Sequence, residues 1–525
     1  MERYILFVSS FVLCVVFVAC SRISEEPYEY EQYEPEVVQI GAPIEIPTPM
    51  YEPEQEPCRR VLFIPEHDTT HDFSEDAFEI VEFVEAVHPN FIIDDRMCME
   101  NYEAFRDKYL ITTAIPMTLT EFVLTTQRFL TVLQDGHISR TFLTGEWVQT
   151  GEEWEWVTGM FQDGYFIDHL FLSRNGRLYL ADEDYIITGV EVLAIGGVPI
   201  DEIFTIIDMY FGAYNYAGRQ RVRGRYARYQ LILHRAGARL YLCEDQLVVD
   251  LTVLKDGKEL TMEMGFTQNH PSAYRLPCYQ PKYSVRYEMK GDDVLYISLR
   301  GRLVGSNSVY RGGLINLCDD YYDANALLSA VEQAMTEDVR KFILDLRNSR
   351  GGNIVIGHLL LNSMGATPPR PGHIIRIGDF NREIVEEFFP TPQICYIQHL
   401  SRDDFIGREY VYIPRDLNQS DNPYGVFIVV LTSERTFSGA TMIATEIADS
   451  GFGMIIGEPS ATAPTGCGWG QSLFPQNSML QIRPHFTFFQ RPDADADQFT
   501  LWPDIHVYEW YALETALEFL NDFSQ

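Results

Sequence analysis

The segment from Tyr424 to Ala444 constrains the fold most, because an apolar strand pattern passes through a short polar turn into an apolar-periodic helix. Strands that lead directly into helices are typical of layered α/β folds, in which helices cover a largely parallel sheet. From about Lys282 onward such patterns alternate, as in DVLYISL, NALLSAVEQAM, KFILDL and GMIIG. The sequence therefore predicts a layered α/β domain over residues 280–525.

Ser438 stands at the start of the predicted helix in this segment. A helix N-terminus directs N–H groups and a partial positive charge outward, so an oxyanion formed beside this serine would meet donors already in place. Serine is also a preferred N-cap residue. The segment alone leaves both interpretations open, a nucleophile and a helix cap.

A second segment, KFILDLRNSRGGN, ends a buried-looking strand in polar residues and then reaches the pair Gly351-Gly352. Adjacent glycines let backbone amides approach a substrate carbonyl closely, although glycine pairs also make ordinary turns. A third segment, LTVLQDGHISR, stops a helix-like run at Asp135-Gly136 and exposes His137. Histidine is the side chain whose ordinary pKa suits a general base near neutrality, but a DGH sequence is also compatible with a simple turn.

Together, in this order, the three segments resemble the tail-specific or C-terminal-processing serine peptidases, including the tricorn core branch. Further similarity lies in FVEAVHPNF, IGEPSATAPTG and LWPDIHV, so the resemblance extends from about Phe73 to about Tyr508. It implies a hydrolase that acts on polypeptides. It also implies a multidomain α+β protein whose layered α/β catalytic core is of the ClpP/crotonase-like type.

The resemblance assigns Ser438 as the nucleophile and His137 as the base. Many members use a lysine base after the serine, but no lysine follows Lys341 in this chain, which leaves the Ser-His-acid arrangement. The acid is expected within RPDADADQF, at Asp497, with Asp493 and Asp495 as rivals. A solvated acidic turn is the alternative interpretation of this stretch.

The resemblance further implies that the N–H groups of Gly352 and Gly439 form an oxyanion hole and that Asn348 and Gly351 contact substrate. No cofactor or metal is expected, because the chain has no Cys-x-x-Cys or His-Glu-x-x-His array and its twelve histidines are dispersed. The net charge of −36 makes nucleic acid an improbable partner. The oligomeric state is left open.

Residues 1–19 read as a signal peptide, since a short charged start precedes an apolar run too short to span a membrane. The ending FVAC resembles the bacterial lipoprotein box, which implies lipidation of Cys20 and an extracytoplasmic, membrane-anchored protein. Ordinary secretion is the alternative. Residues 20–57, rich in Glu, Pro and Tyr, cannot bury a core and are predicted to form a disordered tether.

Between the tether and the α/β domain, residues 58–150 show helical apolar spacing and carry His137. Residues 151–270 change to short alternating strands, and GVEVLAIGGVPIDEIFTII resembles a PDZ-type peptide-binding module. The insert FGAYNYAGRQRVRGRYARYQ interrupts this module. Three functions remain open: an anchored serine endopeptidase, an inactive relative that binds peptides or ligands, and a hydrolase of non-peptide esters or amides.

Overall fold

The computed structural model describes most of the chain beyond the predicted tether. The described residues are 60–61, 70–93, 99–138, 146–150, 153–157, 165–182, 187–243, 246–268, 286–299, 301–303, 324–352, 354–383, 385, 405–478 and 480–522. The predicted signal peptide, Cys20 and the tether lie outside them. From Arg60 onward the described residues belong to one compact unit. None of the helices within these ranges is long and apolar enough to cross a bilayer.

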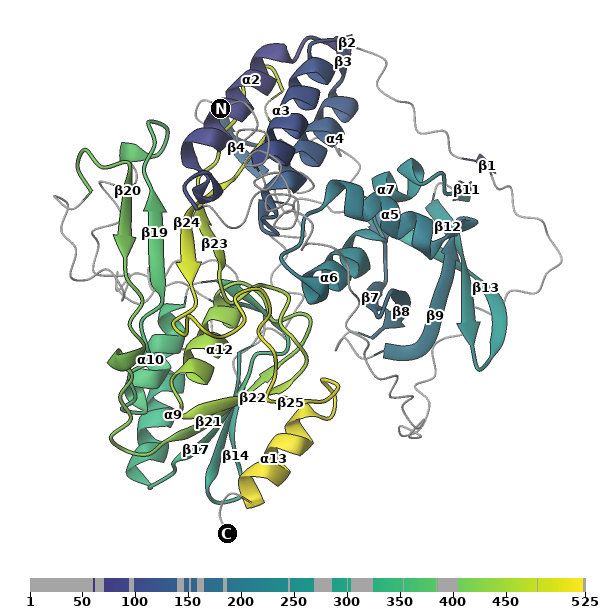
Figure 1. The fold of residues 1–525 in the computed structure, drawn as a ribbon. Coiled ribbons are helices and arrows are strands. Elements are labelled where there is room, and N and C mark those ends of the chain that lie inside the picture. Colours follow the sequence, from purple (N-terminus) through teal and green to yellow (C-terminus); the bar gives the residue numbers. More distant parts are fainter. Residues whose placement is uncertain are drawn as a thin grey trace, which may run out of the picture. The chain divides into compact units, whose positions relative to one another are not determined.

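Three helices pack side by side in the N-terminal part of this unit (Figure 1). They are α2 (Ser74–Val87), α3 (Met99–Thr113) and α4 (Leu119–Leu130), followed by the 3-10 turn η3 (Thr131–Leu133), with the short strands β2 (Thr70–His71) and β3 (Met117–Thr118) pairing beside them. Helix α4 starts at a capping box, in which Thr118 and Glu121 exchange side-chain and backbone hydrogen bonds. Stacked aromatic pairs, Phe73 with Phe122 and Tyr109 with Phe129, fill the space between the helices.

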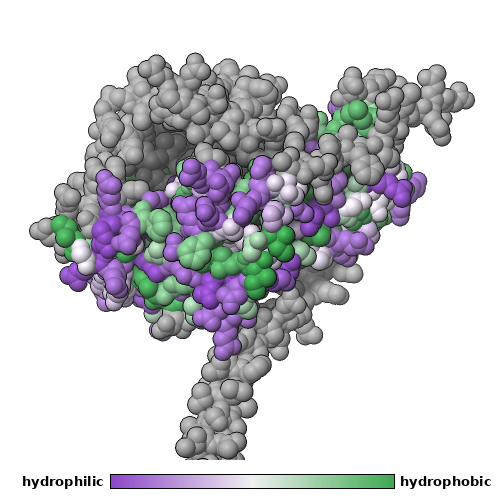
Figure 2. Space-filling view, turned by 90° about the horizontal axis from the view of Figure 1, so that it is seen from above, coloured by the Kyte–Doolittle hydropathy of each residue, from purple (hydrophilic) through white to green (hydrophobic). Residues whose placement is uncertain are grey.

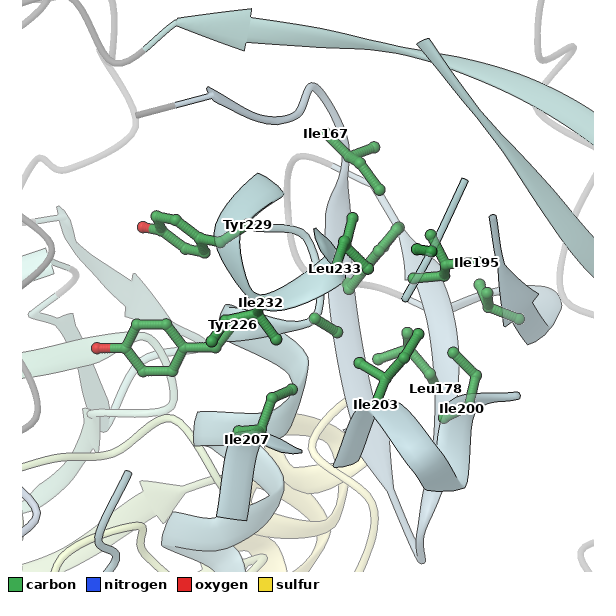
Figure 3. Close-up of a cluster of buried hydrophobic side chains, with 14 of the residues drawn as sticks. Ile167, Leu178, Ile195, Ile200, Ile203, Ile207, Tyr226, Tyr229, Ile232 and Leu233 are labelled. Atoms are coloured by element: carbon green, nitrogen blue, oxygen red, sulfur yellow. The ribbon is translucent and has the colours of Figure 1, made fainter. Parts of the chain in front are cut away.

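Residues 165–268, which we call the β-rich module, combine antiparallel strands with three helices. The strands are β6 (Tyr165–Ile167), β7 (Leu170–Arg174), β8 (Arg177–Ala181), β9 (Ile187–Ile195), β10 (Val198–Pro199), β11 (Leu240–Cys243), β12 (Gln246–Lys255) and β13 (Lys258–Gln268), and the helices are α5 (Ile200–Tyr210), α6 (Tyr216–Tyr226) and α7 (Gln230–Arg235). Figure 3 shows the core that they enclose, where Ile200, Ile203 and Ile207 of α5 lie on one side of that helix. Their i, i+3, i+7 spacing is the amphipathic pattern that fixes α5 on the sheet.

One boundary differs from the sequence prediction. Residues from 58 onward were expected in the helical region, but β1 (Arg60–Val61) pairs antiparallel with Tyr241 and Leu242 of β11 and so joins the sheet of the β-rich module. A two-residue strand carries no periodic signal, so only its pairing partner reveals it. The hairpin of β4 (Glu146–Thr150) and β5 (Glu153–Val157) precedes the module. The other domain boundaries stay predictions.

The C-terminal part is built on a six-stranded sheet in the order β14-β15-β17-β21-β22-β25, parallel except at β14. Its strands are β14 (Arg286–Lys290), β15 (Val294–Ser298), β17 (Lys341–Asp345), β21 (Phe427–Thr432), β22 (Gly453–Gly457) and β25 (Ile505–His506). The helices α9 (Ala324–Thr336), α10 (Val355–Ser363) and α12 (Gly439–Asp449) cover one face, and α13 (Ala512–Asp522) covers the other (Figure 1). Alternate residues of the central strands face the two layers, as Phe342 and Ile343 of β17 do.

Two smaller sheets complete this part. Strand β16 (Gly301–Leu303) pairs parallel with β18 (Ser349–Gly352), and an antiparallel sheet has the order β20 (Tyr410–Ile413), β19 (Gly372–Arg376), β24 (His485–Gln490) and β23 (Gly466–Gly470). On the face that Figure 2 presents, hydrophilic residues are interspersed with smaller hydrophobic areas, in keeping with the acidic composition. The predicted multidomain α/β fold class is confirmed. The PDZ-like character of the β-rich module stays a prediction.

Candidate active site

Ser438 lies between the end of β21 and the first residue of α12, as the strand-turn-helix pattern predicted. Its side chain makes no capping hydrogen bond to the helix, so the N-cap interpretation does not account for the hydroxyl. The backbone has φ of 56° and ψ of −126°, a conformation that a non-glycine residue adopts only under constraint. Hydrogen bonds of the two preceding residues contribute to that constraint, from Phe437 N–H to Ser349 O and from Thr436 Oγ1 to Leu346 O.

His137 lies in the turn that follows η3. The side chain of Asp135 accepts the backbone N–H of His137 at 2.9 Å, which closes the turn locally. His137 Nε2 lies 2.8 Å from Ser438 Oγ, although the two residues are 301 positions apart in the sequence. The histidine ring also packs against Phe437, with ring centroids 4.6 Å apart. The structure therefore brings the predicted nucleophile and the predicted base within hydrogen-bonding distance.

Asp135 is the carboxylate beside His137, and its side chain is fully buried. Its Oδ1 accepts the hydroxyl of Tyr214 at 2.6 Å and lies 3.6 Å from His137 Nδ1. Its Oδ2 lies 2.6 Å from His485 Nδ1 and 3.4 Å from His88 Nε2. Burial alone would raise the pKa of Asp135, but attraction to His485 and the hydrogen bonds from the histidines together hold it well below the usual value. The group is therefore a buried anion at neutral pH.

The hydroxyl of Tyr214 lies between this anion and the base. It is 2.7 Å from His137 Nδ1 and donates to Asp135 Oδ1. Because a hydroxyl has one proton, donation to the carboxylate leaves its oxygen to accept from Nδ1–H of the histidine. That assignment puts the lone pair of His137 on Nε2, which then accepts the proton of Ser438 Oγ. The four side chains form one directed chain of hydrogen bonds.

Asp497 does not occupy the position that the sequence analysis gave it. Its carboxylate is exposed and accepts the N–H groups of Phe499 and Thr500 and the indole N–H of Trp502. The rivals lie in the same surface turn, where Asp493 Oδ1 accepts the N–H of Asp495 at 2.9 Å. These local bonds match the alternative interpretation of a solvated acidic turn. Within the described residues, the carboxylate in contact with His137 is that of Asp135.

The glycines assigned to the oxyanion hole come close to Ser438. Gly351 has φ of 73°, and a Cβ there would lie 2.7 Å from both Ser438 Cβ and Gly439 N. A Cβ on Gly439 would lie 2.5 Å from Gly352 O and 3.2 Å from Gly352 N. The glycines are thus required by the close approach of β18 to the start of α12. Asn348, expected to contact substrate, instead accepts the Nε–H of Arg435 at 2.7 Å.

Two groups of side chains in the described ranges have the composition of a metal site: His88, Asp135 and Cys467, and Asp135, His137 and His485. In the first, His88 Nδ1 accepts the N–H of Asn90 at 3.3 Å, so the Nε2 atom that would bind an ion carries the proton. In the second, the 2.6 Å separation of His485 and Asp135 is a hydrogen-bond length, whereas two ligands of a tetrahedral ion lie roughly 3.3 Å apart. Both groups fit a hydrogen-bond network better than a metal centre. That no cofactor is needed stays a prediction.

Sequence reasoning missed Asp135, Tyr214, His485 and His88 as parts of the site. Asp135 was visible two residues before His137, but it was read only as part of a helix stop. Tyr214 lies in the insert that interrupts the β-rich module, where nothing local indicates a catalytic role. His485 and His88 come from β24 and from the residue after α2, and only the fold brings them to Asp135.

A buried anion, a histidine of defined tautomer and a serine at a helix N-terminus are the parts from which serine hydrolases build their active sites. Residues 313–507, which include Ser438, match the model of peptidase family S41, and this match supports a serine-type peptidase. Among solved structures, mature CPAF has 14% sequence identity and a TM-score of 0.57, covering 86% of this chain and 95% of its own. Mature CPAF complexed with lactacystin has 13% identity and a TM-score of 0.56, with 86% and 97% covered. These two likenesses show the fold. No curated protein sequence matches the chain.

Proposed function

We propose that this peptidase cleaves polypeptides through an acyl-enzyme, with Ser438 as nucleophile, His137 as base and Asp135 as the acid. The 2.8 Å contact between His137 Nε2 and Ser438 Oγ carries this proposal, because it joins the two groups that must exchange a proton. The buried anion of Asp135 stabilises the imidazolium that forms when that exchange occurs.

The steps follow from the directions of the hydrogen bonds. Ser438 Oγ attacks the peptide carbonyl while its proton passes to His137 Nε2, and the carbonyl oxygen becomes an oxyanion. The N–H groups of Gly352 and Gly439, at the approach of β18 to α12, are the proposed donors to that oxyanion. The imidazolium of His137 then protonates the leaving amine, which departs as the C–N bond breaks. Water attacks the ester carbonyl and gives a proton to His137. The ester C–O bond then breaks, His137 returns that proton to Ser438 Oγ, and the carboxylic acid product leaves.

The first test is covalent labelling of the soluble chain, truncated after Cys20, with a fluorophosphonate probe. Wild type should label and should cleave casein, whereas Ser438→Ala and His137→Ala should do neither. A folded wild type that does not label would favour the inactive peptide-binding relative. Labelling with hydrolysis of simple esters but no peptide cleavage would favour the non-peptide hydrolase. Because CPAF forms a complex with lactacystin, that compound is a second probe of the site.

We propose in addition that the protein is lipid-anchored and extracytoplasmic, as the lipoprotein-box resemblance at Cys20 implies. In a bacterial host, the full chain should incorporate a clickable fatty-acid analogue and fractionate with membranes. Cys20→Ser should lose the label and leave the membrane fraction. Unlabelled wild-type protein in the culture medium would instead indicate ordinary secretion.

A further inference from the structure

The loop between α5 and α6 links the β-rich module to the active site. Both helices belong to the core of the module, as Figure 3 shows for Ile203 and Ile207 of α5 and Tyr226 of α6. Four positions after the end of α5, the side chain of Tyr214 reaches His137 and Asp135. A residue of the module thus enters the hydrogen-bond chain that orients the catalytic base.

The ring of Tyr214 is held tightly in this position. A Cβ on Gly136 would lie 2.9 Å from the ring, and a Cβ on Gly466 would lie 3.5 Å from it. The rings of Tyr214 and His137 meet edge-on, with centroids 5.6 Å apart and planes at 69°. The absence of a side chain at Gly136, the residue just before His137, is therefore what admits the tyrosine.

The residues after Tyr214 attach the same loop to the catalytic part. Asn215 Nδ2 donates to Ser460 O and to Phe499 O, each at 3.1 Å, while its Oδ1 caps α6. A Cβ on Gly218 would lie 2.5 Å from Ala461 O, so α6 touches the backbone of that segment directly. The hydrogen bonds of the Asn215 side chain and the close backbone approach at Gly218 therefore define one position of the loop.

Without the hydroxyl of Tyr214, no hydrogen bond would connect the carboxylate of Asp135 to the ring of His137. The direct separation of Asp135 Oδ1 from His137 Nδ1 is 3.6 Å, beyond hydrogen-bonding range. The tyrosine closes that gap with bonds of 2.6 and 2.7 Å. It thereby transmits the orienting effect of the anion to the histidine.

We infer that Tyr214 is a positioning residue that joins Asp135 to His137, and that the peptidase is fully active only while the α5–α6 loop of the β-rich module is attached to the catalytic part. This inference rests on the proposed function. It makes the module a component of the catalytic machinery.

The decisive variant is Tyr214→Phe in the soluble chain truncated after Cys20, which removes the hydroxyl and keeps the ring. We expect kcat to fall about 10- to 150-fold, the range for losing one hydrogen bond to a charged group, with KM nearly unchanged. The imidazolium loses an acceptor at Nδ1, so the acid limb of the pH profile of kcat/KM should move about one unit toward lower pH. Tyr216→Phe, in the first turn of α6, is the matched control and should change neither quantity.

A second variant, Asn215→Ala, keeps the hydroxyl of Tyr214 and removes the bonds to Ser460 and Phe499 together with the N-cap of α6. It should lower kcat several-fold, because the loop is attached in only a fraction of the molecules. The acid limb of the pH profile should stay within about 0.3 units of wild type, because the molecules whose loop is attached keep Tyr214 beside His137. If the wild type is active and Tyr214→Phe has the same kcat and the same pH profile, the inference is overturned and the proposed function stands. If the folded wild type does not label with the fluorophosphonate probe, the proposed function itself is rejected. If Tyr214→Phe does not fold, an Asn215→Ala enzyme with wild-type kcat overturns the inference.

Discussion

Gly351→Ala tests the close approach of β18 to the nucleophile. Gly351 has φ of 73°, and an added Cβ would lie 2.2 Å from Phe437 O and 2.7 Å from Ser438 Cβ. Real Cβ atoms do not approach other atoms below 3.0 Å, and the obstructing atoms here belong mainly to backbone. The segment that carries Ser438 must therefore move.

The size of the effect follows from that overlap. Relief of the contact with Phe437 O requires a displacement of about 1 Å, and a misplacement of that size costs about 10²-fold in rate. The left-handed backbone conformation costs a further ~1–2 kcal/mol of folding stability in alanine relative to glycine. We expect kcat and the rate of fluorophosphonate labelling to fall together by about 10²-fold, since both depend on the position of Ser438 Oγ.

Gly407→Ala is the matched control, because Gly407 has φ of 70° and nothing within 4 Å of an added Cβ. It imposes the same backbone strain without the overlap, so its thermal midpoint should fall modestly while kcat and labelling stay at wild-type values. Folding of each variant is checked by thermal melting. A folded Gly351→Ala protein that labels at the wild-type rate would refute the close approach of β18 to Ser438.

Three other predictions follow from the buried groups. Asp135→Asn should lower kcat by about 10²- to 10⁴-fold, whereas Asp497→Asn should stay within about threefold of wild type; the reverse ranking in peptide kinetics would restore Asp497 as the acid. Burial raises the pKa of Glu458 to about 8 despite the nearby Arg174. Between the ordinary pKa of 4.5 and about 8, Glu458 is therefore protonated in the folded state and ionised in the unfolded state. Stability from this group is complete below that ordinary pKa of 4.5 and is lost as pH rises toward about 8. Thermal midpoints measured over this interval should therefore fall more for wild type than for Glu458→Gln, and parallel curves would contradict this sign. Ile203→Ala should cost about 2–5 kcal/mol in denaturant unfolding, because the side chain is fully buried in the module core; a loss below about 1 kcal/mol would argue against that packing.

The sequence carried enough local information to predict the layered α/β class and to single out Ser438 and His137 as candidates, which the family resemblance then assigned as nucleophile and base. Ser438 is predictable because a strand, a turn and a helix start are contiguous in the chain. His137 is predictable because the helix before it ends at a recognisable stop. Both signals depend on the backbone of a few consecutive residues, which periodicity and turn chemistry describe well.

The proposed acid, Asp135, and the proposed positioning residue, Tyr214, depend on the tertiary structure. Asp497, which the resemblance to the family suggested, accepts hydrogen bonds within its own surface turn. Asp135 is buried among histidines, which keep it ionised and place it near His137. Tyr214 reaches His137 from 77 residues along the chain, and the contact exists only because the β-rich module packs where Gly136 leaves room. Sequence periodicity reports how each segment folds on itself. It does not report which buried polar groups will meet, since that depends on how separate segments satisfy one another's hydrogen bonds.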